Sequence, residues 1–118
     1  MRSEKRRQEA ARKILELINS PTFKAECLIL KPVFVICGAS GSGKTTAIEL
    51  ANEQLPEDEE VAESMDILRC QDADSAQQII ADDDSRYPRS KYIAYSTVNK
   101  PIAQELAKNM NMRVIFVE

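Results

Sequence analysis

The sequence predicts an α/β fold, a three-layer structure in which a parallel β-sheet carries helices on both of its faces. Segments typical of strands alternate with segments typical of helices along most of the chain, as they do in βαβ units. Two strand segments, residues 33–37 and 113–117, contain uninterrupted apolar runs, which suit strands buried on both faces of a sheet. The length of 118 residues suits one small domain, so we expect residues 1–118 to form a single unit.

Residues 1–20 predict a basic amphipathic helix. Six of the first thirteen residues are Lys or Arg, against two Glu, and the sequence Asn19-Ser20-Pro21 is expected to end the helix. The apolar residues that share mostly one face are Ala10, Ala11, Ile14, Leu15, Leu17 and Ile18. Packing of this face on the edge of the domain is the favoured interpretation. Contact with an acidic partner, either nucleic acid or protein, and contact with a membrane surface are the alternatives.

The next segments predict the first strand and helix of the sheet. Residues 26–30 are typical of a short strand or an extended lead-in, and residues 33–37 of a buried strand. Residues 38–43 are expected to form a loop and residues 44–55 a helix. The inner side of that helix is expected to carry Ala47, Ile48, Ala51 and Leu55.

The segments after Pro56 include one with two interpretations. The acidic run at residues 57–60 favours a helix N-terminus, where carboxylates meet the positive end of the helix dipole. Residues 66–70 are typical either of a second strand or of the end of a helix that begins near Pro56. Residues 73–81 predict a helix and residues 82–88 a loop.

The last part of the chain predicts a strand, a helix and a further strand. Residues 92–96 form the strand and residues 100–110 the helix, with Asn99 as its N-cap and Pro101 in its first turn. Residues 113–117 form the last strand. Strands connected by helices in this way are expected to be parallel, with right-handed crossovers.

The three glycines of the chain, Gly38, Gly41 and Gly43, lie within six residues of one another. Residues 38–45 read GASGSGKT and match the pattern GxxxxGK[ST], with a predicted strand before them and a predicted helix after them. Glycines let several backbone N–H groups of such a loop point at one anion, and the N-terminus of the following helix adds positive potential. The sequence therefore predicts a phosphate-binding loop.

Two side chains of this motif can bind parts of the ligand directly. Lys44 can reach the β- and γ-phosphates of a nucleoside triphosphate, and the Thr45 hydroxyl can ligate Mg²⁺. Thr46 supplies a second hydroxyl directly behind it. ATP and Mg²⁺ are the expected cofactors. The residues expected to bind the nucleotide are Gly38, Ala39, Ser40, Gly41, Ser42, Gly43, Lys44, Thr45 and Thr46.

Residues 33–46, VFVICGASGSGKTT, resemble the Walker A segment of P-loop NTPases. The sequence GASGSGKTT is similar to that of the same loop in small nucleoside and nucleotide kinases, and ABC-type and secretion ATPases have close variants of it. More weakly, residues 92–118 are similar to the later half of small kinases of the polynucleotide-kinase type. The resemblance implies binding of ATP, or a similar nucleoside triphosphate, with Mg²⁺, and phosphoryl transfer or ATP hydrolysis of the small-kinase type.

Phosphoryl transfer also needs an acidic residue at the end of a strand beside the loop, to hold Mg²⁺ or its water. Glu118 follows the last apolar strand and is the candidate both for a metal ligand and for a catalytic carboxylate. Asp66 and Asp72 flank the ambiguous segment and are further candidates. Because histidine is absent, a general base would have to be one of these carboxylates. A less favoured alternative for a divalent ion is the run Asp82, Asp83 and Asp84.

Charge that develops on the γ-phosphate has to be met by a lysine or an arginine. Lys44 and Arg86 are the candidates for this catalytic role, with Arg89 as an alternative in the same loop. Polar residues at the end of the predicted strand 92–96 either contact the γ-phosphate or orient a water, or they cap the following helix. These residues are Ser96, Thr97 and Asn99.

The composition excludes several other classes of site. Without histidine, these 118 residues contain no Ser-His triad and no His-ligated zinc. Cys27, Cys37 and Cys70 form no CxxC motif, so a thiolate zinc site is not expected and a reducing cytoplasm is the expected compartment. No apolar run approaches the ~20 residues of a membrane span, so we expect no membrane partner.

Three functions from different classes remain after these exclusions. The first is a small kinase-like enzyme that moves the γ-phosphoryl group of ATP. The second is an ATPase module of a larger, nucleic-acid-associated assembly, in which a neighbouring chain of the oligomer completes the site. The third is a non-catalytic phosphate-binding module, minimal or designed. The net charge of −3 does not favour nucleic acid, although the basic first helix does.

Overall fold

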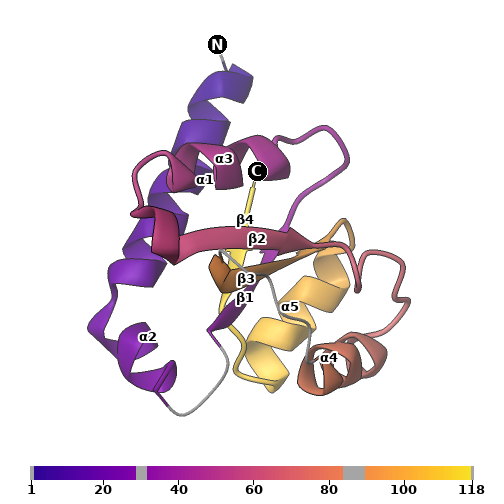
Figure 1. Cartoon of the computed structure of the whole chain (residues 1–118). Coiled ribbons are helices and arrows are strands. Elements are labelled where there is room, and N and C mark those ends of the chain that lie inside the picture. The colour runs from indigo at the N-terminus through magenta and orange to yellow at the C-terminus, as the bar shows by residue number, and fades with distance from the viewer. Residues whose placement is uncertain (1, 29–31, 84–89, 118) are drawn as a thin grey trace.

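Four parallel strands form one sheet in the order β2-β3-β1-β4, and helices cover both of its faces (Figure 1). The computed structural model describes residues 2–28, 32–83 and 90–117. The predicted fold class is thereby confirmed. The elements are α1 (Arg2–Asn19), α2 (Pro21–Glu26), β1 (Val33–Cys37), α3 (Lys44–Asn52), the 3₁₀ helix η1 (Glu57–Glu59), β2 (Glu60–Ser64), α4 (Ala73–Asp82), β3 (Ser90–Thr97), α5 (Lys100–Asn109) and β4 (Val114–Phe116).

Strand β1 lies inside the sheet, as its apolar sequence predicts. Val35 of β1 pairs with Tyr95 of β3 on one side and with Val114 of β4 on the other. The side chains of Phe34 and Ile36 are fully buried, like that of Val35. Strand β2 pairs with β3 and forms one edge of the sheet, and β4 forms the other.

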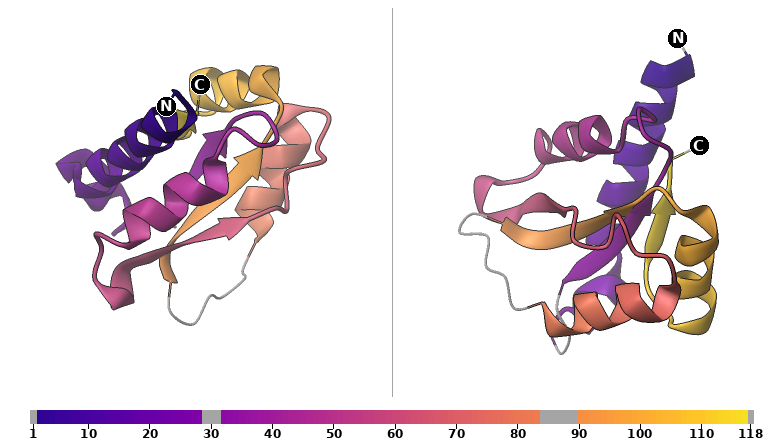
Figure 2. Two further views of the ribbon diagram at one scale, coloured as in Figure 1. Left: turned by 90° about the horizontal axis from the view of Figure 1, so that it is seen from above. Right: turned by 90° about the vertical axis from the view of Figure 1, so that its right-hand side faces the viewer.

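Alternate residues of β1 contribute to two cores, one on each face of the sheet. Phe34 and Ile36 belong to the core beneath α1, α2 and α3, and Val35 belongs to the core beneath α4 and α5. In Figure 1 and in the right-hand view of Figure 2, α3 and α4 lie on opposite sides of the strands. Helix α1 buries its predicted apolar face in the first core, so its predicted packing on the domain is confirmed. Among the described residues, no helix is both long enough and apolar enough to cross a membrane.

The connections between the strands diverge at the carboxyl ends of β1 and β3. From β1 the chain passes through α3 to β2, and from β3 it passes through α5 to β4 in the opposite direction along the sheet. Because parallel crossovers have one hand, these opposite directions require α3 and α5 to lie on opposite faces, as they do. The two loops therefore turn away from each other and leave a crevice between them. Ligands of open α/β sheets bind in crevices of this kind.

The region between α3 and α4 differs from the prediction. Helix α3 ends at Asn52 rather than at residue 55, and the acidic run forms η1 and the start of β2 rather than an α-helix. Strand β2 is an edge strand in which only Val61 and Ser64 are buried, so it lacks the continuous apolar run that marks a central strand. Residues 66–70 are neither a strand nor a helix end; they form turns, from which Ile67 reaches into the second core.

The segment after α1 also differs from the prediction. The Ser20 hydroxyl accepts a hydrogen bond from the backbone N–H of Phe23 (3.5 Å), and Pro21 occupies the first position of α2. The Ser-Pro sequence that ends α1 therefore also begins a second helix, because proline suits a first helical position. The short strand or extended lead-in expected at residues 26–30 is wrong for residues 26–28, which end α2 and form a turn, and residues 29–30 lie outside the described residues.

Candidate functional site

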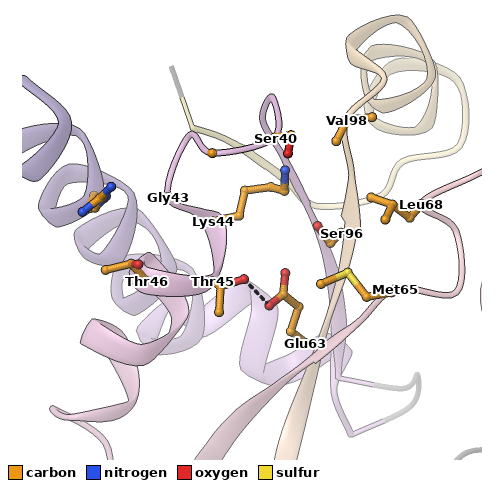
Figure 3. Close-up of a pocket in the computed structure, with 12 residues that line it drawn as sticks. Ser40, Gly43, Lys44, Thr45, Thr46, Glu63, Met65, Leu68, Ser96 and Val98 are labelled. Carbon is orange, nitrogen blue, oxygen red and sulfur yellow. Dashed lines mark hydrogen bonds between the residues drawn. The ribbon is translucent and has the colours of Figure 1, made fainter.

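A cavity of about 340 Å³ lies at the carboxyl ends of β1, β3 and β2 (Figure 3). It occupies the crevice where the connections from β1 and β3 diverge. Residues from the loop after β1 and from α3 form one wall, and residues from β2, the turn after it and the end of β3 form the other. Its lining is Arg7, Ser40, Gly41, Gly43, Lys44, Thr45, Thr46, Glu63, Met65, Leu68, Ser96 and Val98.

Residues 38–43, which we call the glycine loop, connect β1 to α3 through two left-handed residues. Gly41 has φ +80° and Gly43 has φ +101°, a region that residues with a Cβ rarely adopt. The backbone N–H of Ala47 donates to the Gly43 carbonyl (2.8 Å), which starts α3, and no side chain caps the start of this helix. The first N–H groups of a helix have no partners within it, so the end of the loop presents backbone donors suited to an anion.

Gly43 is further constrained by a close neighbour. A Cβ at this position would lie 2.5 Å from Cγ and 2.7 Å from Nε of Arg7, whereas a Cβ at Gly41 would meet nothing within 4 Å. Replacing Gly43 with alanine is therefore expected to lower the free energy of unfolding by about 1–3 kcal/mol, and by more than Gly41→Ala, which carries the backbone strain alone. Urea denaturation of both variants tests this. Equal losses would show that the contact with Arg7 contributes nothing.

Lys44 lies at the start of α3, where its side chain folds back over the glycine loop. The residue is 8% exposed, and its ammonium group donates to the carbonyl oxygens of Gly38 and Ala39, the latter at 3.3 Å. Burial lowers the pKa of Lys44 below its usual range, while Cys37 and Glu63 act in the opposite direction. A bound anion would compensate the burial of this charge.

Thr45 and Glu63 form a hydrogen-bonded pair across the cavity. The Thr45 hydroxyl donates to Oε1 of Glu63 at 2.7 Å, which links α3 to β2 (Figure 3). Sequence analysis missed Glu63 because β2 was not predicted. A weak signal was available: an acidic residue in a short segment, near the end of what could be a strand, after the helix that carries Lys44 and Thr45.

Four buried polar side-chain atoms have no hydrogen-bond partner in the described part of the chain, and all four lie at this site. Three belong to residues that line the cavity, and the fourth belongs to the glycine loop. Buried polar atoms are normally hydrogen-bonded, so a cluster of exceptions indicates a place for water or a polar ligand. The four atoms are Nε of Arg7, Oγ of Ser42, Oε2 of Glu63 and Oγ of Ser96.

Most of the predicted binding residues meet at the cavity. Six of them line it directly, namely Ser40, Gly41, Gly43, Lys44, Thr45 and Thr46. Gly38, Ala39 and Ser42 belong to the same loop without lining this cavity. Of the polar residues at the end of β3, Ser96 lines the cavity, whereas Asn99 caps α5 by accepting from the N–H of Ile102 (3.2 Å).

Of the other predicted catalytic and metal-binding residues, those that the structure describes do not line the cavity. Asp66 is exposed in the turn after β2 and does not line it, and Asp72 caps α4 by accepting from the N–H of Ser75 (2.7 Å). Arg86 and Glu118 lie outside the described residues, as do Arg89 and Asp84. Among residues 2–28, 32–83 and 90–117, no group of three or more acidic or cysteine side chains is arranged to hold a metal ion.

Three of the basic residues of α1 contact other residues of the chain. Arg12 makes ion pairs with Glu9 and Glu16, and Lys13 donates to the carbonyl oxygen of Phe116 at 3.5 Å. Arg7 lines the cavity, a position that sequence analysis did not anticipate. An acidic partner for this helix, whether nucleic acid or protein, therefore stays a prediction.

Comparisons with known proteins bring no further information about the site. No protein-family model matches the chain, no curated protein matches it, and no solved structure matches it.

Proposed function

We propose that the cavity binds the phosphate groups of ATP, or of a similar nucleoside triphosphate, together with Mg²⁺, and that residues 38–45 act as a P-loop. The observation that carries the proposal is that three features surround one cavity, which lies in the crevice where the connections from β1 and β3 diverge. These features are the glycine loop with its two left-handed residues, the buried Lys44 and the pair of Thr45 with Glu63. Each suits a different part of a metal-bound polyphosphate.

The phosphate oxygens are bound by donors that the loop and α3 supply. Backbone N–H groups of residues 39–45 surround them, apart from that of Ser42, which already donates to the Ala39 carbonyl (3.0 Å). The Lys44 ammonium exchanges the carbonyl oxygens of Gly38 and Ala39 for phosphate oxygens. The hydroxyl groups of Ser42 and Ser96 are buried with no partner in the described part of the chain, and they can donate to the same ligand. A bound phosphate would thus supply the hydrogen-bond acceptors that the buried hydroxyl groups at this site lack.

The donor set beside Lys44 fits magnesium. Mg²⁺ takes oxygen ligands, and Thr45 and Glu63 supply a hydroxyl and a carboxylate that already lie 2.7 Å apart. Bound there, Mg²⁺ would neutralise charge on the β- and γ-phosphates. Glu63 thus takes the role for which the sequence suggested Glu118 or Asp66.

Glu63 is also the proposed general base. Among the described residues that line the cavity it is the only carboxylate, and its Oε2 atom is buried without a partner. In hydrolysis, the oxygen of a water forms a bond to the γ-phosphorus, the bond to the ADP oxygen breaks, and the proton of the water passes to Oε2. A kinase reaction would differ only in that an acceptor hydroxyl replaces the water. The proposed compartment is a reducing cytoplasm, because the three cysteines, all in the described part of the chain, form no disulfide.

The test is calorimetric titration of Mg-ATP into the wild type and Lys44→Ala, with phosphate release measured on the same samples. Loss of a charged hydrogen-bond donor should weaken binding about 10- to 100-fold. The control, Lys24→Ala, removes an exposed charge from α2 and should bind like the wild type. Equal affinities of the wild type and Lys44→Ala would overturn the proposal.

Phosphate release then distinguishes the forms of the function. Phosphate release by the wild type supports hydrolysis. A rate of release per protein molecule that rises with protein concentration, or with added DNA, supports the module of a larger assembly. Tight binding with no release supports a non-catalytic module.

A further inference from the structure

Arg7 of α1 lies against the glycine loop with its side chain partly unsatisfied. It lines the cavity, and the space beside Gly43 that a Cβ would need is taken by its Cγ, Nε and Cδ atoms. Its Nε atom is buried and has no hydrogen-bond partner in the described part of the chain. Burial of a guanidinium nitrogen without an acceptor costs folding free energy. An arginine at this position is therefore expected to have an anion as its partner.

Arg7 lies on the same face of α1 as the residues that are buried in the first core. Ala10, Ala11 and Ile14 follow Arg7 at the spacings i+3, i+4 and i+7, and all three are buried in the first core. Residues at these spacings share one helical face, so Arg7 extends the buried face of α1 to the level of the glycine loop. The packing of α1 therefore aims this arginine at the cavity.

Arg12, another arginine of α1, has a different environment. Arg12 is exposed and paired with Glu9 and Glu16, one turn away in each direction. Exposed pairs of this kind stabilise a helix only slightly and need no ligand. Arg7 instead stands beside the backbone donors of the loop, where it would add to their positive potential.

We infer that the guanidinium of Arg7 donates hydrogen bonds to a phosphate group bound in the glycine loop. The inference rests on the proposed function and makes α1 part of the binding site. Thr46 lies on the α1 side of the site, whereas Glu63 and Ser96 lie on the opposite side (Figure 3). Arg7 and Glu63 therefore approach the ligand from different sides, the arginine to bind a phosphate and the carboxylate to accept a proton.

The test uses Arg7→Met, which keeps an unbranched side chain against Gly43 and removes the guanidinium. Mg-ATP and pyrophosphate are titrated into the wild type, Arg7→Met, Arg6→Met and Lys44→Ala. Arg6 is adjacent on α1, is only half-buried and does not line the cavity, so Arg6→Met is the matched control. Arg7→Met is expected to weaken both ligands about 10- to 100-fold, and Arg6→Met less than about twofold, because only Arg7 makes a charge-assisted hydrogen bond.

The outcomes separate this inference from the proposed function. If Lys44→Ala loses binding while Arg7→Met binds like the wild type, the role of Arg7 is overturned and the proposed function stands. If Arg7→Met weakens ATP and leaves pyrophosphate unchanged, the contact is not to a phosphate and the inference fails. If the wild type binds neither ligand, both fail.

A second variant covers the case in which Arg7→Met lowers the thermal midpoint of unfolding. Arg7→Lys keeps the charge and the aliphatic stem but loses the planar pair of donors. It is expected to bind both ligands more weakly than the wild type, with an unchanged thermal midpoint. Unchanged affinity of a folded Arg7→Lys for both ligands overturns the inference, whether or not Arg7→Met is stable enough to titrate.

Discussion

Replacing Glu63 with glutamine is expected to lower the rate of phosphate release from ATP by about 100-fold or more, because a positioned general base contributes about 10²–10⁴-fold to a rate. Glutamine keeps an oxygen that accepts from the Thr45 hydroxyl, so the link between α3 and β2 is preserved. Glutamine lacks the basic Oε2 atom, which in the wild type is buried and has no hydrogen-bond partner among the described residues. Glutamine also offers Mg²⁺ an oxygen ligand without the negative charge, so the affinity for Mg-ATP should fall as well, but by a smaller factor than the rate. The affinity and the rate are measured on the same preparation.

The matched control for this prediction is Asp66→Asn. Asp66 lies three residues after Glu63, and it is exposed and does not line the cavity. The same loss of one carboxylate should leave both release and binding near their wild-type values. Loss of release in Asp66→Asn with full release in Glu63→Gln would restore Asp66 to the role that the sequence suggested. A wild type that binds ATP without releasing phosphate would contradict the prediction.

Replacing Phe34 with alanine is expected to lower the free energy of unfolding by about 3–5 kcal/mol, the usual cost of removing a fully buried phenylalanine. Phe34 lies in the middle of the sheet, between β3 and β4, and its ring is fully buried in the core beneath α1 and α3. Urea denaturation gives the free energy, and an unchanged slope with denaturant would show that the unfolded state is the same.

Phe116→Ala removes the same atoms from a position on the edge strand β4 that is only partly buried. Its cost should be less than half that of Phe34→Ala, because less apolar surface is returned to water and no enclosed cavity remains. Similar costs at the two positions would mean that the central strand is not the best-packed part of the core.

The fold could be predicted from sequence wherever burial on both faces of the sheet made the pattern simple. Residues 33–37 and 114–117 are apolar because β1 and the end of the chain pack between two cores, and a continuous apolar run is typical of that position. Strand β2 could not be recognised in this way. It lies at the edge of the sheet, and its sequence alternates too weakly, with Glu60 and Glu63 beside the buried Val61 and Ser64.

The site was predictable only as far as its determinants are local. The glycine loop, Lys44 and Thr45 are consecutive, so one motif contains them all. Glu63 reaches Thr45 from 18 residues away and Arg7 reaches Gly43 from a separate helix, so their places depend on the sheet order and on the packing of α1. Arg7 did leave a signal, since it occupies the apolar face of its helix.

Lys44 has a consequence for the state of the glycine loop before any ligand binds. Its backbone stands at the end of the loop, and its ammonium is hydrogen-bonded to carbonyl oxygens at the beginning of the loop. The side chain thus closes a ring that holds the two ends of the loop together. A loop that is already ordered loses little conformational entropy when a ligand binds, so its backbone is preorganised. The cost of binding lies instead in the Lys44 ammonium, which has to exchange the two carbonyl oxygens for phosphate oxygens.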